Sequence, residues 1–196
     1  AHEKGMDFFA SLRLGGYGGM DPALCTRNGG RGFVHEEMRD HQLAVLRELA
    51  TDYPTDGVEL DLAAPPFGGS SLLQNEDVPG YMLVMTEWVR KVSEMVRGRS
   101  GGSGQVGARV YPTEEMNLAK GLDIRTMLRE GLLDYVTPYI YGYNVVDSNM
   151  PLDWLVEAAH DADTSIYPMV QPFYFLEDER RFHTREYATT EMMRAA

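Results

Sequence analysis

The chain has 196 residues, of which 43% are apolar, a composition typical of a globular domain with a sizeable core and not of a disordered chain. Its formal net charge of −12 would repel nucleic-acid backbones and anionic membrane surfaces, and no local basic patch offsets it, so neither is an expected partner. No apolar run approaches the roughly 18 residues that a membrane-spanning helix requires.

Strand-like and helix-like segments alternate along the chain, a pattern typical of an α/β domain whose parallel strands are joined by helical crossovers. Five strands are predicted, at residues 8–13, 57–62, 106–111, 134–141 and 166–171. Apolar residues at helical spacing predict helices at residues 36–53, at 79–97 and from Pro151 onward. The tail from Thr184 is also expected to be helical.

Two short helices are predicted between the third and fourth strands. Thr113 and Asp123 belong to residue types that commonly cap the N-terminus of a helix. Gly121 and Gly131 stand where each of these helices would end.

The predicted loops that follow strands are longer than most of those that precede them. Long loops at the C-terminal ends of parallel strands build the active face of a (β/α)8 TIM barrel or of an open doubly wound sheet, and the barrel is our preferred fold. Five βα units are fewer than the eight of a closed barrel, which takes roughly 250 residues. We therefore expect residues 1–196 to be a single partial TIM-barrel domain, an incomplete fragment that lacks at least one strand before Phe8 and about two after the tail. The long loops are at residues 14–35, 63–77, 142–150 and 172–183.

The second predicted strand carries two carboxylates on one side. Side chains alternate along a strand, so Val58, Leu60 and Leu62 share one face while Glu59 and Asp61 share the other. In a barrel the apolar face meets the helices and the second face lines the lumen, with Asp61 at its mouth and Glu59 one layer below. Two buried neighbouring anions push their pKa values apart, which suits acid–base chemistry. We predict that both are catalytic.

Two arginines on neighbouring strands can offset the negative charge of these acids. Arg13 ends the first predicted strand and Arg109 lies within the third, so we predict that both contact the substrate. An alternative interpretation is an internal polar layer, in which Glu59 and Asp61 only form salt bridges with the arginines. Carboxylates at the C-terminal ends of barrel strands favour the functional interpretation.

Aromatic residues follow the fourth and fifth predicted strands. Tyr139, Tyr141 and Tyr143 alternate at the end of the fourth strand, and Gln171 ends the fifth. Aromatic rings at the rim of a cleft stack on sugar faces, so Tyr139, Tyr141 and Gln171 are predicted to bind substrate. Packing of loops on the barrel top is the alternative.

No cofactor or metal is predicted. The glycines in residues 14–32 fit neither the dinucleotide fingerprint nor the Walker pattern, and favour a loop over the cleft. The five histidines form no cluster with the acids at recognisable metal-ligand spacing. The single cysteine, Cys25, excludes an internal disulfide.

The chain resembles a known family in four segments that occur in the family's order: AHEKGMDFFASLRLGG, VHEEMRDHQLAVLRELATDYPTDGVELDL, ARVYPTEEMNLAKGLDIRTMLREGLLDYVTPYIY and YPMVQPF. They resemble the glycosyl hydrolase-like 10 domains, bacterial TIM-barrel proteins also described as family 10-like glycoside hydrolases. The resemblance implies a barrel with site residues at Arg13, Glu59, Asp61 and Arg109. The chain departs from the family's pattern in having RLGG and AAPPF where many relatives have Arg-Met-Asn-like and Arg-His-Pro-like runs.

A second resemblance is to chitinase-type barrels, whose strand signature also begins with Asp-Gly and ends in a catalytic Glu. Ala63 occupies that last place here, so the substrate-assisted chitinase mechanism does not carry over.

The function these observations favour is a glycoside hydrolase that acts on an oligo- or polysaccharide by carboxylate acid–base chemistry in a cleft at the C-terminal face of the barrel. One of the two acids could instead work with an acid from a missing strand. The alternative function is a carbohydrate-binding barrel without catalysis. The sequence indicates neither the sugar nor the oligomeric state, and the family resemblance is compatible with a secreted or cell-envelope location.

Overall fold

The computed structural model describes residues 1–15, 20–63, 72–98, 103–138, 150–169, 173–178 and 181–186. Three residues predicted to bind substrate, Tyr139, Tyr141 and Gln171, lie outside these ranges. The other four predicted site residues lie within them.

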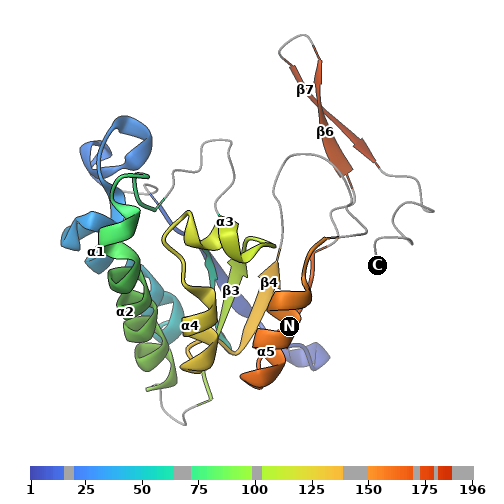
Figure 1. The fold of residues 1–196 in the computed structure, drawn as a ribbon. Helices are drawn as coiled ribbons and strands as arrows, with labels where there is room; N and C mark the ends of the chain where they lie inside the picture. The colour runs from blue at the N-terminus through green and yellow to red at the C-terminus, as the bar shows by residue number, and fades with distance from the viewer. Residues whose placement is uncertain are drawn as a thin grey trace.

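Five parallel strands form one sheet in sequential order, β1-β2-β3-β4-β5 (Figure 1). This is the order of consecutive βα units in a TIM barrel, whereas a doubly wound sheet reverses its strand order. The α/β class is therefore confirmed and the order is consistent with a partial barrel, although no barrel closes among the described residues. The strands are β1 (Phe9–Arg13), β2 (Gly57–Asp61), β3 (Gln105–Val110), β4 (Tyr135–Pro138) and β5 (Ser165–Ile166).

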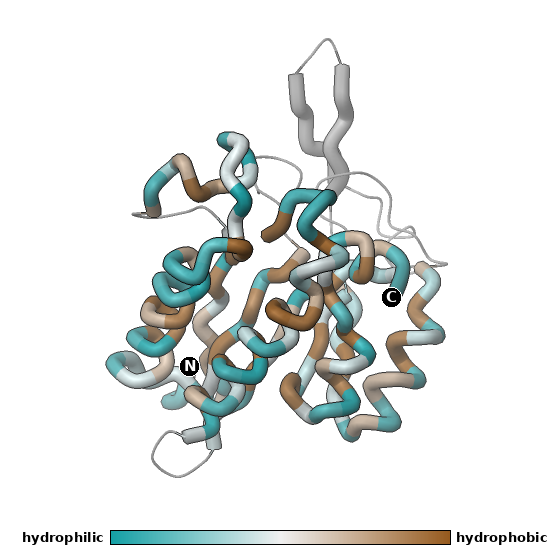
Figure 2. Tube along the Cα trace, turned by 60° about the vertical axis from the view of Figure 1, so that its left-hand side comes forward, coloured by the Kyte–Doolittle hydropathy of each residue, from teal (hydrophilic) through white to brown (hydrophobic). Residues whose placement is uncertain are grey.

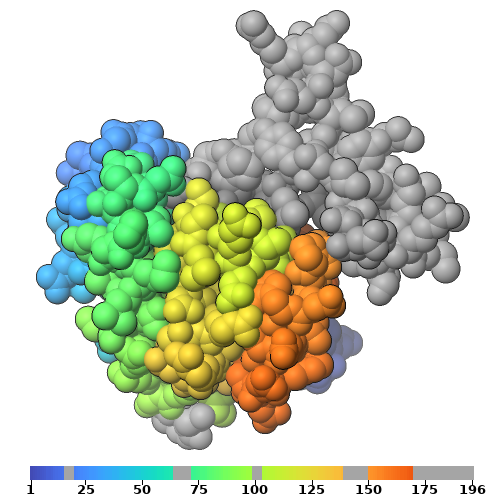
Figure 3. Space-filling model, viewed as in Figure 1, coloured from blue at the N-terminus to red at the C-terminus, as the bar shows by residue number. Residues whose placement is uncertain are grey.

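The helices cover one face of this sheet. Along the chain α1 packs against α2, α2 against α4 and α4 against α5, so the helices lie side by side (Figures 1 and 3). No helix in the described part of the chain is long and apolar enough to cross a bilayer. The helices are α1 (Glu36–Thr51), α2 (Val78–Arg97), α3 (Glu114–Leu118), α4 (Ile124–Arg129) and α5 (Asp153–Asp161).

The core lies between the helices and the even-numbered face of the strands. Leu60 of β2 and Ala108 of β3 are fully buried there, together with Leu46 of α1 and Met85 of α2. In Figure 2 the coiled helical segments alternate between hydrophobic and hydrophilic residues. The alternation along β2 that the sequence predicted is thus present, with its apolar side under the helices.

Both predicted short helices are present with the expected caps. The hydroxyl of Thr113 accepts a hydrogen bond from the amide of Met116 at the start of α3. The carboxylate of Asp123 accepts one from the amide of Thr126 at the start of α4. Each helix is followed within three residues by a glycine with positive φ, a conformation that costs glycine little.

The C-terminal part of the chain differs from the prediction. Residues 172–183, expected to be a loop, contain β6 (Phe173–Asp178) and the start of β7 (Arg181–Glu186), which pair as an antiparallel hairpin. Thr184 was expected to open a helix and lies in β7 instead. Aromatic and β-branched residues within these segments favour strands, and pairing between the two segments decides the outcome.

The fifth strand is shorter than predicted. It ends at Ile166, although the amides of Tyr167 and Met169 still donate hydrogen bonds to carbonyls of β4. Pro168 lies between them and has no amide hydrogen to donate to a further strand.

Candidate active site on the sheet face opposite the helices

The parallel register brings the predicted acids and arginines together on the face opposite the helices. In the layer nearest the strand C-termini, Asp61 is the pairing partner of Arg13 on β1 and of Arg109 on β3. In the layer below, Glu59 is the pairing partner of Ser11 on β1. Because side chains at alternate positions share a face, the four charged residues and Ser11 converge on the same side of the sheet.

Glu59 is held by three donors. Its Oε1 accepts hydrogen bonds from Arg109 Nε at 2.6 Å and from Ser11 Oγ at 2.8 Å, and its Oε2 accepts a longer one from Tyr135 Oη at 3.4 Å. The Glu59 side chain is 12% exposed and that of Arg109 is 35% exposed. The carboxylate therefore serves as the common acceptor that links β1, β3 and β4 to β2.

Tyr135 reaches Glu59 across a glycine. A Cβ at Gly107, which lies between Glu59 and Tyr135 in the register, would come within 1.9 Å of Tyr135 Cζ. The Tyr135 ring also packs edge-on against Phe9 and Tyr167, with centroids 5.3 and 5.9 Å away. Burial, and then the charge of Glu59, raise the pKa of Tyr135, so its hydroxyl stays protonated and can donate at neutral pH.

Asp61 occupies the last position of β2 and is 6% exposed. Tyr111 is the first residue after β3 and lies two positions beyond Arg109. Burial raises the pKa of Tyr111, and the charge of Asp61 raises it further. Asp61 thus acts electrostatically on a phenol at the same edge of the sheet.

The loops at this edge are tied to one another. Arg31 binds both carboxylate oxygens of the largely buried Asp77, which joins the loop after β1 to the segment before α2. The hydrogen bond from Arg31 lowers the pKa of Asp77. Gln74 adds hydrogen bonds from its side-chain amide to the carbonyls of Thr26 and Gly30. Residues 22–34 also form three short 3-10 helices, so this part of the glycine-rich loop is folded onto its neighbour.

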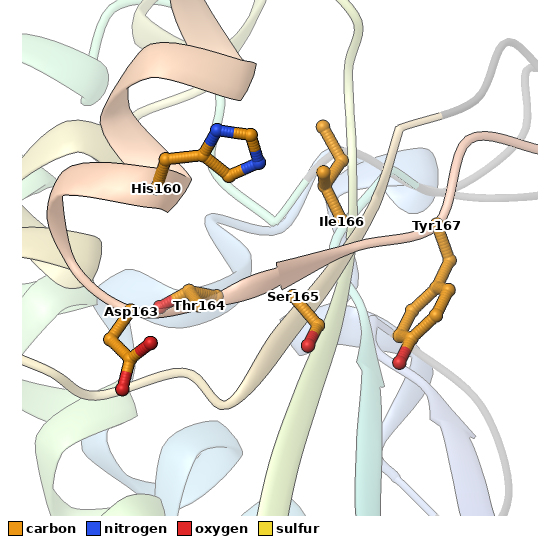
Figure 4. Close-up of a pocket in the computed structure, with 6 residues that line it drawn as sticks. All are labelled: His160, Asp163, Thr164, Ser165, Ile166 and Tyr167. Atoms are coloured by element: carbon orange, nitrogen blue, oxygen red, sulfur yellow. The ribbon is translucent and has the colours of Figure 1, made fainter.

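A separate open hollow of about 510 Å³ lies beside β5. In the close-up of Figure 4, Ser165 and Tyr167 point to the same side of β5, whereas Ile166 points to the other. No predicted site residue lines this hollow, although Tyr167, which does, packs against the Tyr135 ring. The residues that line the hollow are His160, Asp163, Thr164, Ser165, Ile166 and Tyr167.

Among the described residues, no group of three or more His, Cys, Asp or Glu side chains lies where it could hold a metal ion. Glu59 is paired with arginine and hydroxyl donors instead. Polar residues of this face that sequence reasoning missed include Ser11, Tyr135 and Thr137, and Tyr111 follows β3 at the same edge. These residues have odd-numbered positions on strands or just beyond them, as Glu59 and Asp61 do. The sequence alone did not give the register between those strands and β2, so their closeness to the acids could not be predicted.

No family model matches the chain, and no curated protein matches it. Among solved structures, the chain is similar to the chitinase domain of the spore coat protein CotE from Clostridium difficile, with a TM-score of 0.53 and 16% sequence identity. The match covers 98% of this chain and 55% of that one, so the chain spans about half the length of the structure it matches.

At this identity the likeness concerns the fold alone. The chain shares the fold of part of that chitinase domain, which agrees with the α/β architecture and with the sequential strand order. The match does not extend to the glycosyl hydrolase-like 10 family, so that resemblance stays a prediction. Ala63, where a chitinase-type strand signature would end in Glu, is 3% exposed and lies two residues after the end of β2.

Proposed function

We propose that the chain contributes to the active site of a glycoside hydrolase that acts on an oligo- or polysaccharide at the C-terminal edge of the sheet. The observation that carries the proposal is the layer of Arg13, Asp61 and Arg109 at the C-terminal ends of three neighbouring parallel strands, on the face away from the helices. Barrel enzymes place their reacting groups at this edge. The fold likeness to a chitinase domain supports the same class of reaction.

The two acids have different tasks in this proposal. Glycosidases use one carboxyl group to protonate the leaving oxygen and another to attack the sugar or to activate water. Asp61, in the layer nearest the strand C-termini, is the carboxylate that contacts the sugar in this proposal. Glu59, one layer below, positions Arg109 and the hydroxyls of Ser11 and Tyr135. The second reacting carboxyl group in this proposal comes from a residue outside the five-stranded sheet.

A carbohydrate-binding barrel without catalysis is the second candidate. Ala63 favours the binding barrel. A chitinase-type signature would carry an acid at this position, whereas here the position holds a buried methyl group. Arginine, carboxylate and phenol groups at one edge can hold sugar hydroxyls without cleaving a bond.

The two candidate functions can be separated by measuring reducing-end release. The substrates are chito-, cello- and xylo-tetraose, each incubated with the full-length protein. A hydrolase is expected to cleave at least one of the three. Binding by isothermal calorimetry without cleavage of any of them would favour the binding barrel, and neither binding nor cleavage would contradict both candidates.

A further inference from the structure

The loop after β1 contains the one Asn-Gly dipeptide of the chain, Asn28–Gly29. Asparagine followed by glycine is the pair most prone to deamidation, because a residue without a Cβ leaves its backbone nitrogen accessible to the asparagine side chain. Asn28 is exposed, so water and hydroxide reach it. The dipeptide has no part in the sugar chemistry proposed above.

Deamidation joins the Gly29 nitrogen to Cγ of Asn28. Solvent hydroxide removes the proton of the Gly29 amide, and the nitrogen attacks Cγ. The bond between Cγ and Nδ2 then breaks, and Nδ2 leaves as ammonia with a proton from water. Water hydrolyses the resulting five-membered succinimide ring at either of its two carbonyls, which yields aspartate or isoaspartate. The reaction therefore needs only water and hydroxide, and both products carry one more negative charge than asparagine.

The folded loop holds both reacting groups away from this reaction. Asn28 Nδ2 donates to the Pro22 carbonyl at 2.9 Å, and the Gly29 amide donates to the Thr26 carbonyl at 3.1 Å. Asn28 is also the last residue of the 3-10 helix η3 (Thr26–Asn28). Closure of the succinimide ring requires rotation about the Cα–C bond of Asn28 out of the helical conformation. Attack therefore requires this part of the loop to open.

The segment before α2 keeps the loop closed. Gln74 Nε2 donates to the carbonyl of Thr26 at 2.9 Å and to that of Gly30 at 2.8 Å, so its side chain bridges the residues on either side of the dipeptide. The Thr26 carbonyl is the same oxygen that accepts from the Gly29 amide. Gln74 lies 48 residues after Thr26, so loop opening breaks a contact between distant parts of the chain.

We propose that Asn28 is a deamidation site gated by the contact between the loop after β1 and the segment before α2. Deamidation proceeds from the open loop, so its rate is the open fraction multiplied by the rate in the unfolded chain. The aspartate product cannot restore the closed loop, because a carboxylate has no hydrogen to donate to the Pro22 carbonyl. The modification thus changes this loop permanently, and the inference is independent of the proposed sugar chemistry.

The first test compares folded wild-type protein with the same chain unfolded in guanidinium chloride, both kept at mildly alkaline pH. Peptide mapping with mass spectrometry follows the conversion of Asn28 to aspartate and isoaspartate. Conversion is expected to be at least about 10-fold slower in the folded protein, because two hydrogen bonds must break before attack. Equal rates in the two states would overturn the inference.

The second test removes the bridge. Gln74→Met keeps the length of the side chain and loses both hydrogen bonds. It is expected to speed deamidation of Asn28 and hydrogen exchange of the Gly29 amide, followed by NMR, about 3- to 10-fold each. Gln105→Met makes the same change at an exposed glutamine at the start of β3 and should alter neither rate. Thermal unfolding establishes that each variant is folded.

Arg31→Gln opens the same loop from another contact, because it breaks the ion pair between Arg31 and Asp77, and it serves as the test if Gln74→Met does not fold. Parallel increases of deamidation and exchange in either folded variant would support the gate. Deamidation at the wild-type rate in both folded variants would overturn it.

Asn28→Asp carries one of the two products from the outset. Exchange of its Gly29 amide is expected to be about 3- to 10-fold faster than in wild type, since the hydrogen bond to the Pro22 carbonyl is lost. An unchanged exchange rate would contradict a permanent change in the loop.

Discussion

Asp61→Asn is expected to lower the rate of oligosaccharide hydrolysis about 10²- to 10⁴-fold, the usual contribution of a positioned acid or base. Asparagine has nearly the shape of aspartate but can neither attack the sugar nor take up a proton from water. Because the substitution keeps nearly the same side-chain volume at a position that is 6% exposed, it should change the chemistry more than the fold. The measurement is reducing-end release by the variant on the best tetrasaccharide for wild type.

Two variants make this result specific. Asp161→Asn removes the same charge from an exposed site on α5 and should leave the rate unchanged. Glu59→Gln should lower the thermal unfolding temperature, because it breaks an ion pair with a partly buried arginine and disturbs two further hydrogen bonds. An Asp61→Asn protein that is folded and as active as wild type would contradict the role of Asp61.

Gly107→Ala is expected to destabilise the protein by about 1–3 kcal/mol, a typical cost of overpacking. The new methyl group would lie 1.9 Å from Tyr135 Cζ. The ring cannot move away cheaply, because Phe9 and Tyr167 pack against it and Glu59 accepts from its hydroxyl. Urea denaturation of wild type and variant measures this cost.

Gly80→Ala is the matched control. No heavy atom lies within 4 Å of a Cβ at Gly80, which is in the first turn of α2, so alanine there should be neutral or stabilise by up to about 1 kcal/mol. Combining Gly107→Ala with Tyr135→Leu should cost less than the sum of the two single changes, since the shortened side chain relieves the clash. Strict additivity would show that Gly107 and Tyr135 are not in contact.

Local patterns in the sequence predicted much of the fold. Alternation in β2 separated Leu60 from Glu59 and Asp61, and the apolar stripe of α2 together with the caps of α3 and α4 placed these helices to within a few residues. These features depend on residues that are close together in the chain. The hairpin was missed, with β6 predicted as loop and the end of β7 as helix, because pairing between the two segments decides the outcome.

The partners of Glu59 could not be predicted from the sequence. Ser11 lies 48 residues away and Tyr135 lies 76 residues away, so both contacts depend on the register of neighbouring strands. The sequence did not single out Gly107, because what matters there is the absence of a Cβ, which leaves room for the Tyr135 ring. Arg13 and Arg109 were predicted as neighbours of the acids, and the register places both beside Asp61. The roles predicted for Tyr139, Tyr141 and Gln171 stay predictions.

A crystal structure of Asp61→Asn with a bound tetrasaccharide tests most directly whether the odd-numbered face of β2 is a sugar site. We expect sugar rings at the C-terminal ends of β1, β2 and β3, with a sugar oxygen within hydrogen-bond distance of residue 61. Sugar seated instead on the helix-covered side, or only in the hollow beside β5 that Tyr167 lines, would contradict the account.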